Sequence, residues 1–334
     1  MILVTGGTGL VGSHLLYDLV KQDKPVRAII RNKNKIKQVK KIFSYYSDDF
    51  ENLIEKIDWV EGDILDLYSL EKSLVDIHEV YHCAAIVAIG GRKEEELIQA
   101  NVVGTENVVN LCLEHQVKKL CHVSSIASLG GVLNGELIDE NRNWTSSKNR
   151  SAYSISKYKS EMEIWRGIQE GLSAVIVNPS VILGPGFWNS GSGALFSKAA
   201  KGMKYYTNGT TGFVDVRDVV GVMIDLMEGD VSSERFVLNS ENLNYKQLFN
   251  MIAEAMQVAK PKKVATKGVL QLAVVLDSFA SKLSIKKQEI TKDIVRASIS
   301  HSRYSSEKIK NTIGREFIPI KKSISDIAEK FKNN

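Results

Sequence analysis

The chain has 334 residues, of which 43% are hydrophobic and 25% are charged. This length exceeds the roughly 250–300 residues at which a single core stops growing, so we expect one large α/β unit or two fused lobes. The two fractions are those of an ordinary globular protein, which excludes a disordered chain, and the presence of only five prolines excludes a collagenous or proline-rich one.

The formal net charge of +5 is distributed unevenly along the chain. Residues 260–334 carry 17 Lys and Arg against 7 Asp and Glu, whereas residues 1–259 carry 27 against 32. A basic C-terminal region is most often a set of solvated helix faces, but it also fits an anionic substrate or contact with an acidic membrane surface. Nucleic acid is not an expected partner, because the basic residues do not alternate with aromatic ones and no DNA-binding motif accompanies them.

Cysteine usage and the apolar runs bear on the compartment. The cysteines are odd in number, lack CxxC spacing and lie in apolar contexts, which favours reduced core thiols over a disulfide or a metal site: Cys83, Cys112 and Cys121. Met1 is followed at once by an apolar run without a basic region or a cleavage site, which predicts a buried strand rather than a secretion signal. The apolar stretch from Val269 to Leu276 is far shorter than the roughly 18–20 residues of a membrane span. We therefore expect a cytoplasmic protein without an integral membrane segment.

Strand and helix patterns alternate over the first half of the chain. Short β-branched runs predict strands at residues 2–4, 26–30, 58–60, 80–83, 120–123 and 174–177. Helical periodicity between them predicts helices at residues 10–21, 94–115 and 153–169. Strands that are apolar on both faces and separated by helices indicate a parallel sheet with helices on each side. The expected fold class is α/β, with a Rossmann-type doubly wound parallel sheet of at least six strands.

The alternation weakens after about residue 180, where glycine, serine and aromatic residues become frequent. Residues 213–228 then predict a strand and a helix, and residues 235–238 a strand, both of which could return to the sheet. We therefore expect a Rossmann domain of residues 1–178 plus about 213–238, and a smaller, mostly helical substrate lobe of about 179–212 plus 239–334. Pocket-wall candidates in that lobe, for which packing between lobes is an equally good explanation, are Phe187, Trp188, Tyr205, Tyr206 and Phe213.

A glycine-rich run, residues 5–12, follows the first strand and opens the first helix. It fits GxxGxxG through Gly6, Gly9 and Gly12, and also GxGxxG through Gly7. Glycine allows a tight turn and a close backbone approach to a pyrophosphate, which then lies at the helix N-terminus, where free N–H groups favour negative charge. Because strand, glycines and helix occur in the required order, the run predicts dinucleotide binding.

The end of the second strand indicates which dinucleotide is bound. An Asp or Glu there would read a free ribose 2′-hydroxyl, but the strand ends in Arg31-Asn32-Lys33. A guanidinium can bind a 2′-phosphate with two hydrogen bonds, so we predict NADP over NAD, unless Arg31 is only a solvent-facing strand end. Asp63, after the third strand, is placed to accept from an adenine amino group, and a helix-capping role competes with this one.

Tyr153 and Lys157 place a phenol and an ammonium one turn apart on a predicted helix. The spacing alone means little, because it recurs at residues 17/21, 68/72 and 304/308. Position distinguishes Tyr153: its helix follows the strand that ends in Ser124-Ser125, and open α/β sheets place their sites at the carboxyl ends of strands. A phenol titrates near ~10, so it needs nearby positive charge to work near neutrality.

The glycine run and the Ser-Tyr-Lys set together resemble the extended branch of the short-chain dehydrogenase/reductase superfamily, the NAD-dependent epimerase/dehydratase family. Further matching segments are His82-Cys83-Ala84-Ala85 (HxAA), residues 101–105 (NVxGT), residues 213–219 (FVxVxDV) and the C-terminal stretch from Tyr304 to Pro319. The resemblance covers nearly the whole chain. Within the branch, Val26-Arg27-Ala28 leading to Arg31, Asp139-Glu140-Asn141 and Trp144 look most like the dihydroflavonol-reductase-like group.

The resemblance implies roles for single residues. Tyr153 would be the general acid, Lys157 would bind the nicotinamide ribose and support Tyr153, and Ser125 would hydrogen-bond the carbonyl oxygen. Ser125 is preferred to Ser124 because the second serine of the family's pattern points into the site. Asn101 would hold its helix or a proton-relaying water, the structural role being preferred. The cofactor-binding residues would be Gly6, Gly9, Leu10, Val11, Gly12, Arg31, Asp63, Ile64, Ala84, Ala85, Asn101, Tyr153, Lys157 and Pro179. Core packing is expected for His82, His122 and Cys83, and the loop 86–96 has no family counterpart that assigns it a role.

Three functions compete at this point. The first is an NADP(H)-dependent reductase of a small, hydrophobic carbonyl compound, or the reverse oxidation of its alcohol. The second is a nucleotide-sugar epimerase or dehydratase with tightly bound NAD, which an acid in place of Arg31 would favour. The third is a cofactor-sensing binding protein, against which the intact Ser-Tyr-Lys set argues. A monomer and a homodimer are both compatible with the sequence.

Overall fold

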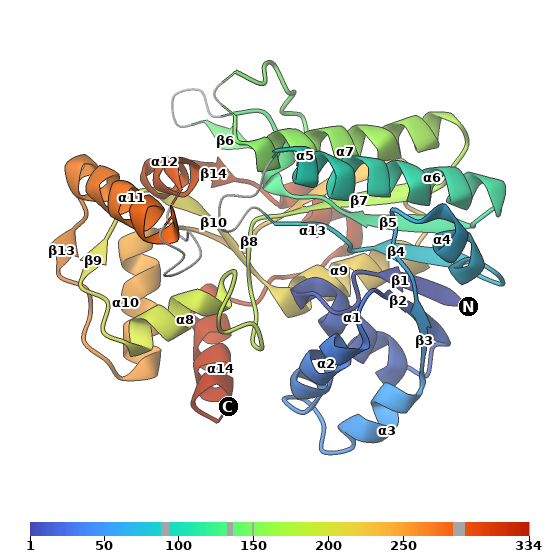
Figure 1. Cartoon of the computed structure of the whole chain (residues 1–334), viewed down its shortest axis with the longest axis horizontal. Coiled ribbons are helices and arrows are strands. Elements are labelled where there is room, and N and C mark those ends of the chain that lie inside the picture. The colour runs from blue at the N-terminus through green and yellow to red at the C-terminus, as the bar shows by residue number, and fades with distance from the viewer. Residues whose placement is uncertain (88–93, 132–135, 149, 283–290, 334) are drawn as a thin grey trace.

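The structure, a computed structural model, describes residues 1–87, 94–131, 136–148, 150–282 and 291–333. The Gly90-Gly91-Arg92 part of the loop 86–96 lies outside these residues. A large parallel sheet with helices on both faces forms one side of the molecule, and a smaller, mainly helical lobe forms the other (Figure 1). None of the helices within the described ranges is both long and apolar enough to cross a membrane.

The large sheet has seven strands, all paired in parallel, which confirms the predicted doubly wound sheet. In spatial order the strands are β11 (Glu234–Leu238), β7 (Ala174–Pro179), β5 (Lys119–Val123), β4 (Glu79–His82), β1 (Ile2–Thr5), β2 (Val26–Ile30) and β3 (Ile57–Glu61). Every residue of β1 and of β7 is buried, as expected for strands covered on both faces.

Helices cover both faces of this sheet and bury two separate apolar clusters against it. One face carries α1 (Leu10–Lys21), α2 (Ile36–Phe43), α3 (Phe50–Glu55), α9 (Val216–Glu228) and α13 (Glu307–Ile313). The other face carries α4 (Leu67–Ser73), α6 (Gly104–Glu114) and α7 (Ala152–Gln169). The helix predicted for residues 94–115 is continuous but contains a π-helical segment, η2 (Ile98–Val103), between α5 (Glu94–Leu97) and α6.

The second lobe combines helices with short strands around its own apolar cluster. Its helices are α8 (Gly193–Ala200), α10 (Tyr245–Met256), α11 (Lys267–Lys282), α12 (Lys292–Ile299) and α14 (Ile320–Lys332). Its strands form a sheet of β12 (Glu241–Asn244), β10 (Thr210–Asp215) and β8 (Val181–Leu183), and a pair of β13 (Lys263–Val264) and β9 (Tyr205–Tyr206). A further pair joins β6 (Leu137–Ile138) to β14 (Arg303–Tyr304). The aromatic residues Trp188, Tyr206 and Phe213 lie in the cluster, so they pack the lobe, whereas Tyr205 is exposed.

One strand expected to return to the large sheet does not do so. The strand predicted at Phe213, β10, pairs with β8 and β12 in the smaller sheet. The place beside β7 is taken by β11, whose Leu238 pairs with Pro179. Of the predicted strand–helix unit, only α9 therefore returns to cover the large sheet, where it packs on β5, β7 and α1. The predicted boundaries of the two domains stay a prediction.

Candidate active site

The glycine run forms a turn that cannot hold larger residues. Gly6 has a positive φ of +69°, and a Cβ there would lie 2.6 Å from the backbone nitrogen of Ala84. A Cβ on Gly12 would lie 2.3 Å from the carbonyl oxygen of Gly6, which accepts a hydrogen bond from the Gly9 nitrogen at 2.9 Å. The chain therefore packs backbone against backbone here, as a close approach to a pyrophosphate requires.

The helix after this turn offers the groups that an anion needs. Its N-cap is Gly9, which makes no side-chain capping bond, and the first turn holds Leu10, Val11 and Gly12. The N–H groups of a first helical turn have no partner within the helix and carry its positive dipole end. The residues present thus fit a dinucleotide phosphate at this position.

Arg31 and Asp63 lie together where β2 and β3 end. Nη1 of Arg31 is 3.6 Å from Oδ2 of Asp63, and the arginine side chain is 57% exposed. The other carboxylate oxygen, Oδ1, accepts from the Leu65 nitrogen at 3.1 Å. Asp63 therefore caps a turn ahead of α4 rather than α4 itself. Ile64, next to it, packs against Gly104 at the start of α6.

The candidate catalytic residues come together at the carboxyl end of β5. Ser151 caps α7 by accepting from the Ser154 nitrogen at 3.1 Å, which sets the start of the helix that carries Tyr153. The side chain of Ser125 lies next to the Tyr153 phenol and influences its pKa. Lys157, one turn along and only 1% exposed, donates from Nζ to the carbonyl oxygen of Val123 at 2.9 Å.

Burial changes the acid–base properties of this group. It raises the pKa of the Tyr153 phenol above its usual value, and the neighbouring side chain of Ser125 opposes that rise. Burial lowers the pKa of Lys157 to about 8, against the opposing influence of the Glu161 carboxylate. A proton donor, Tyr153, and an amine whose protonation can change near neutral pH, Lys157, therefore lie on one helix face. This arrangement can protonate an oxygen held beside Ser125 and stabilise the phenolate that results.

Ser124, by contrast, belongs to a buried network centred on Glu161. Oε2 of Glu161, which is fully buried, accepts from Oγ of Ser124 at 2.6 Å, from Oγ of Ser128 at 2.7 Å and from Nδ2 of Asn178 at 2.8 Å. Oε1 accepts from Arg235 on β11 at 3.0 Å. One carboxylate therefore ties α7 to the turn after β5, to β7 and to β11.

Sequence reasoning missed this network, although a signal was present. Glu161 follows Lys157 by four residues, as Lys157 follows Tyr153, so the three side chains share one helix face. A carboxylate on the face of a helix that turns toward a buried sheet requires partners. Those partners, Asn178 and Arg235, lie 17 and 74 residues further along the chain, where no local spacing points to them.

Asn101 anchors the loop that follows β4. Its Oδ1 accepts from the Ile86 nitrogen at 2.7 Å, and its Nδ2 donates to the Ile86 carbonyl at 3.0 Å and to Oγ of Ser156 at 3.0 Å. It lies in η2, a π-helical segment of the kind that is frequent at functional sites. The same loop holds Ala84, whose nitrogen donates to Oγ1 of Thr5 at 3.2 Å, and Ala85.

The two histidines near the site are structural. Their rings stack at 5.2 Å between centroids, and Nδ1 of His82 hydrogen-bonds Oγ1 of Thr5 at 2.8 Å. Burial lowers the pKa of His82 to about 3 and that of His122 well below its usual value, so both are neutral. The three cysteines are free thiols. Within the described ranges, no three His, Cys, Asp or Glu side chains are grouped to hold a metal.

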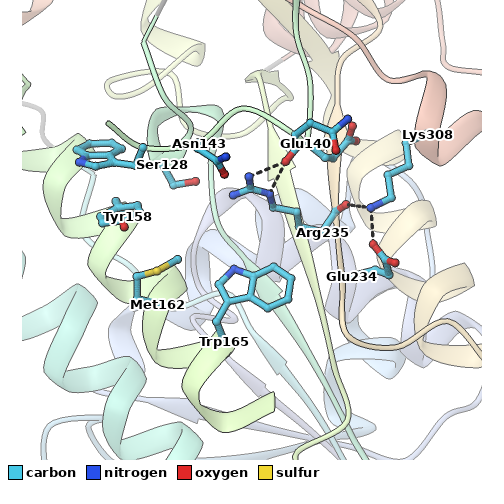
Figure 2. Close-up of a pocket in the computed structure, with 11 residues that line it drawn as sticks. Ser128, Glu140, Asn143, Tyr158, Met162, Trp165, Glu234, Arg235 and Lys308 are labelled. Atoms are coloured by element: carbon cyan, nitrogen blue, oxygen red, sulfur yellow. Dashed lines mark hydrogen bonds and ion pairs between the residues drawn. The ribbon is translucent and has the colours of Figure 1, made fainter. Parts of the chain in front are cut away.

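A cavity of about 530 Å³ is lined in part by Ser128 and Arg235, two residues that hydrogen-bond Glu161 (Figure 2). Figure 2 shows Arg235 reaching the carbonyl oxygen of Glu140, and Lys308 between Arg235 and Glu234. None of the described residues that line the cavity is a predicted catalytic or cofactor-binding residue. The lining residues are Ser128, Glu140, Asn141, Asn143, Trp144, Tyr158, Met162, Trp165, Glu234, Arg235 and Lys308. The charged groups of this lining have partners: Arg235 is paired with Glu161, Lys308 is paired with Glu234, and Glu140 accepts a hydrogen bond from the Val237 nitrogen.

The fold and the phosphate turn define a Rossmann-type, NAD(P)-dependent short-chain dehydrogenase/reductase. The family model of the NAD dependent epimerase/dehydratase family matches residues 2–238, and the chain belongs to that family. A putative dihydroflavonol 4-reductase of Synechocystis is 28% identical over 340 residues, which cover 99% of this chain and 94% of the relative. Sterol demethylase protein B of Methylococcus capsulatus is 28% identical over 273 residues, 80% of this chain and 78% of the relative.

Solved structures agree on the fold. The crystal structure of gox2253 has a TM-score of 0.81 at 26% identity and covers 100% of this chain and 98% of its own. A UDP-glucose 4-epimerase of Thermotoga maritima, solved with UDP-glucose, has a TM-score of 0.75 at 20% identity, with 99% and 98% covered. At that identity the likeness shows the fold alone, so the choice between reductase and epimerase depends on the site.

Proposed function

We propose that this enzyme reduces the carbonyl group of a small, hydrophobic compound with NADPH, or oxidises the corresponding alcohol with NADP. The grouping of Ser125, Tyr153 and Lys157 at the carboxyl end of β5 carries the proposal, because it brings a proton donor and a cation next to an oxygen-binding hydroxyl. The glycine turn that would hold the cofactor follows β1, in the same sheet as β5. Relatives named as a cinnamoyl-CoA reductase and a tetraketide alpha-pyrone reductase support a reductase.

The residues would divide the reaction as follows. The bound nicotinamide would supply the hydride to the carbonyl carbon. Ser125 would hold the carbonyl oxygen by a hydrogen bond, and Tyr153 would donate the proton that completes the alcohol. Lys157 would bind the nicotinamide ribose and, as an ammonium, stabilise the phenolate left on Tyr153. The carbonyl compound would gain one hydride and one proton, and a proton from solvent would restore the Tyr153 phenol.

The preference for NADP rests on Arg31. More than half of its side chain is exposed at the end of β2, where a ribose 2′-phosphate would lie, and its Nη1 is 3.6 Å from the Asp63 carboxylate. A guanidinium forms charge-assisted hydrogen bonds to phosphate, whereas an acid at this strand end would repel it. Gly6, Gly9, Leu10, Val11 and Gly12 would hold the pyrophosphate. Asp63, Ile64, Ala84, Ala85, Asn101 and Pro179 would complete the cofactor cleft.

Calorimetric titration of the nucleotide-stripped protein with NADPH and NADH tests the cofactor, after identification of any nucleotide carried from the cell. Tighter and freely exchanging NADPH, together with NADPH oxidation on a panel of hydrophobic aldehydes and ketones, would support the reductase. Tightly retained NAD would instead indicate a redox-neutral epimerase or dehydratase. Binding of neither nucleotide would overturn the cofactor assignment. The free thiols fit a reducing compartment such as the cytoplasm, and sedimentation would distinguish a homodimer from a monomer.

A further inference from the structure

Exposed apolar side chains gather in one corner of the second lobe. Among the described residues, fourteen large hydrophobic side chains are exposed, and eight of them belong to β9, β13, α11 and α12. These eight, called here the apolar corner, are Tyr205, Val264, Val269, Leu272, Val275, Leu276, Ile294 and Ile299. Figure 1 shows α11 and α12 side by side at the end of the molecule furthest from β3, with β13 and β9 next to them.

The corner is a coherent surface rather than a scatter of single residues. On α11, Val269, Leu272 and Leu276 follow the i, i+3, i+7 spacing of one helix face, with Leu272 59% and Leu276 60% exposed. None of the residues of α12, Lys292–Ile299, is buried. A helix face of a globular protein normally buries such side chains against its own core, whereas the described residues leave this face exposed.

Positive charge is concentrated in the stretch of sequence that forms most of the corner. Residues 260–299 carry nine Lys and Arg against three Asp and Glu, a net +6, whereas the rest of the chain carries 35 against 36. The net positive charge of the protein therefore comes from the stretch that contains α11 and α12. Among the described side chains, Lys262 lies just before β13, Lys263 begins β13 and Lys292 begins α12, and all three are exposed.

We propose that the apolar corner is a peripheral membrane surface that binds an anionic lipid bilayer. An apolar helix face with lysines around it inserts at the boundary between headgroups and acyl chains, while the ammonium groups contact anionic headgroups. None of the described helices, α11 included, is long and apolar enough to cross a bilayer, so the protein would lie on its surface. This proposal is independent of the proposed reaction, because none of its residues belongs to the candidate active site.

Charge decides between a bilayer and a second copy of the chain. Two copies joined through this corner would bring two net +6 segments together, and like charges facing each other oppose association. An anionic bilayer pairs with the same charges. The apolar and the electrostatic features of the corner therefore favour the same partner.

Co-sedimentation with phosphatidylcholine vesicles, with and without phosphatidylglycerol, tests the proposal on the full chain. We expect binding to the anionic vesicles, and we expect it to weaken by about tenfold or more between about 0.1 M and about 1 M NaCl, as the Debye length falls from about 10 Å to about 3 Å. The variant Leu272→Asp/Leu276→Asp should lose about tenfold or more in partitioning because it places carboxylates on the inserting face.

Leu67→Asp/Val75→Asp is the matched control, since both residues are exposed but lie outside the corner, at the start of α4 and just after its end. It should bind vesicles as the unmodified protein does. Circular dichroism and thermal melting of all variants separate loss of binding from loss of fold. Equal vesicle binding by both double variants would overturn the proposal. A second pair of results would also overturn it: sedimentation shows a dimer that Leu272→Asp/Leu276→Asp abolishes, and none of the proteins binds anionic vesicles. The corner would then be an interface between copies of the chain.

Discussion

The guanidinium of Arg31 and the carboxylate of Asp63 lie 3.6 Å apart, so the residue expected to select the cofactor is held by the residue expected to contact its adenine. A ribose 2′-phosphate would compete with this carboxylate for the same cation. Asp63 also accepts from the Leu65 nitrogen at 3.1 Å, which restrains its position. If the proposed NADP site is correct, the pair would therefore lower its affinity for the 2′-phosphate.

This competition predicts opposite effects of two substitutions. Arg31→Leu should weaken NADPH binding by about ten- to a hundredfold, the worth of a charge-assisted hydrogen bond, and leave NADH binding nearly unchanged. Asp63→Asn should strengthen NADPH binding, because it frees the guanidinium. Calorimetric titration with both nucleotides measures the effects. Equal losses for NADPH and NADH with Arg31→Leu would assign the residue to the fold and not to the phosphate.

Tyr153→Phe should lower turnover by about 100- to 10,000-fold, since it removes the proposed proton donor. Nucleotide affinity should stay within about twofold, as the ring and its packing are kept. Steady-state kinetics and calorimetry on the same preparation measure the two effects. Tyr68→Phe offers a control, because Tyr68 shares the spacing to a lysine but is exposed on α4. Retained turnover in Tyr153→Phe would remove Tyr153 from the mechanism.

The two neighbouring serines should differ in what they affect. Ser125→Ala removes the hydroxyl next to the Tyr153 phenol and should lower kcat by about 100- to 1,000-fold. It also removes the helix-capping hydrogen bond from the Ala127 nitrogen, which should cost about 0.5–2 kcal/mol of stability. Ser124→Ala removes a hydrogen bond to the buried Glu161 and should lower the free energy of unfolding by about 1–3 kcal/mol. Kinetics and urea unfolding of both variants provide the comparison, and interchanged effects would assign the two serines the other way round.

Glu161→Gln should destabilise the protein by up to about 3–5 kcal/mol, because it leaves the Arg235 cation, only 16% exposed, without its carboxylate. The double variant Glu161→Gln/Arg235→Met should recover part of that loss, since no uncompensated charge remains. Urea unfolding of the single and double variants forms a double-mutant cycle. Additive losses would show that the pair is not coupled, contrary to the 3.0 Å contact.

Asp218 predicts a pH dependence of stability. Burial raises the pKa of its carboxyl from 3.8 to about 6. The folded state therefore favours the protonated carboxyl, which is present at low pH. As pH rises from about 4 through about 6 the carboxyl ionises, and the fold loses the stability that the protonated form gave it. Asp218→Asn should therefore raise the free energy of unfolding by up to about 3 kcal/mol at pH ~7, at 1.36 kcal/mol per pKa unit.

Urea unfolding at pH ~4 and pH ~7 checks this sign. The amide oxygen of the asparagine can still accept from the Ile318 nitrogen, which donates to Asp218 at 2.8 Å, so the substitution mainly removes the ionisation. A gain from Asp218→Asn that is as large at pH ~4 as at pH ~7 would contradict the assignment, because no ionised carboxylate remains to be relieved at the lower pH.

The sequence was sufficient to predict the large sheet because its strands are apolar on both faces. Helical periodicity likewise predicted the first helix, residues 10–21, with its observed ends. The position of β10 was not predictable, since Phe213 and Val214 are as apolar as any central strand and only the pairing of Leu238 with Pro179 excludes β10 from that place. Local spacing likewise marked Tyr153 and Lys157, whereas the partners of Glu161 come from distant segments that only the fold brings together.

The exposed face of α11 shows a second limit of sequence patterns. The spacing of Val269, Leu272 and Leu276 is the same whether that face meets a core or meets solvent. Periodicity reports that a face is apolar and does not report what lies against it. Only the exposed fractions distinguish the two cases.

The position of β11 at the edge of the large sheet makes the order of synthesis matter. This strand pairs with β7, yet the chain builds residues 180–233, including β8, α8 and β10, before β11 becomes available. Until then the backbone N–H and C=O groups on one side of β7 have no partner strand, and its residues, which are buried in the complete fold, lie at an edge of the sheet. Such an edge can pair with strands from other chains. A fragment that ends before Glu234 should therefore aggregate, and the two lobes must mature together during translation instead of one after the other.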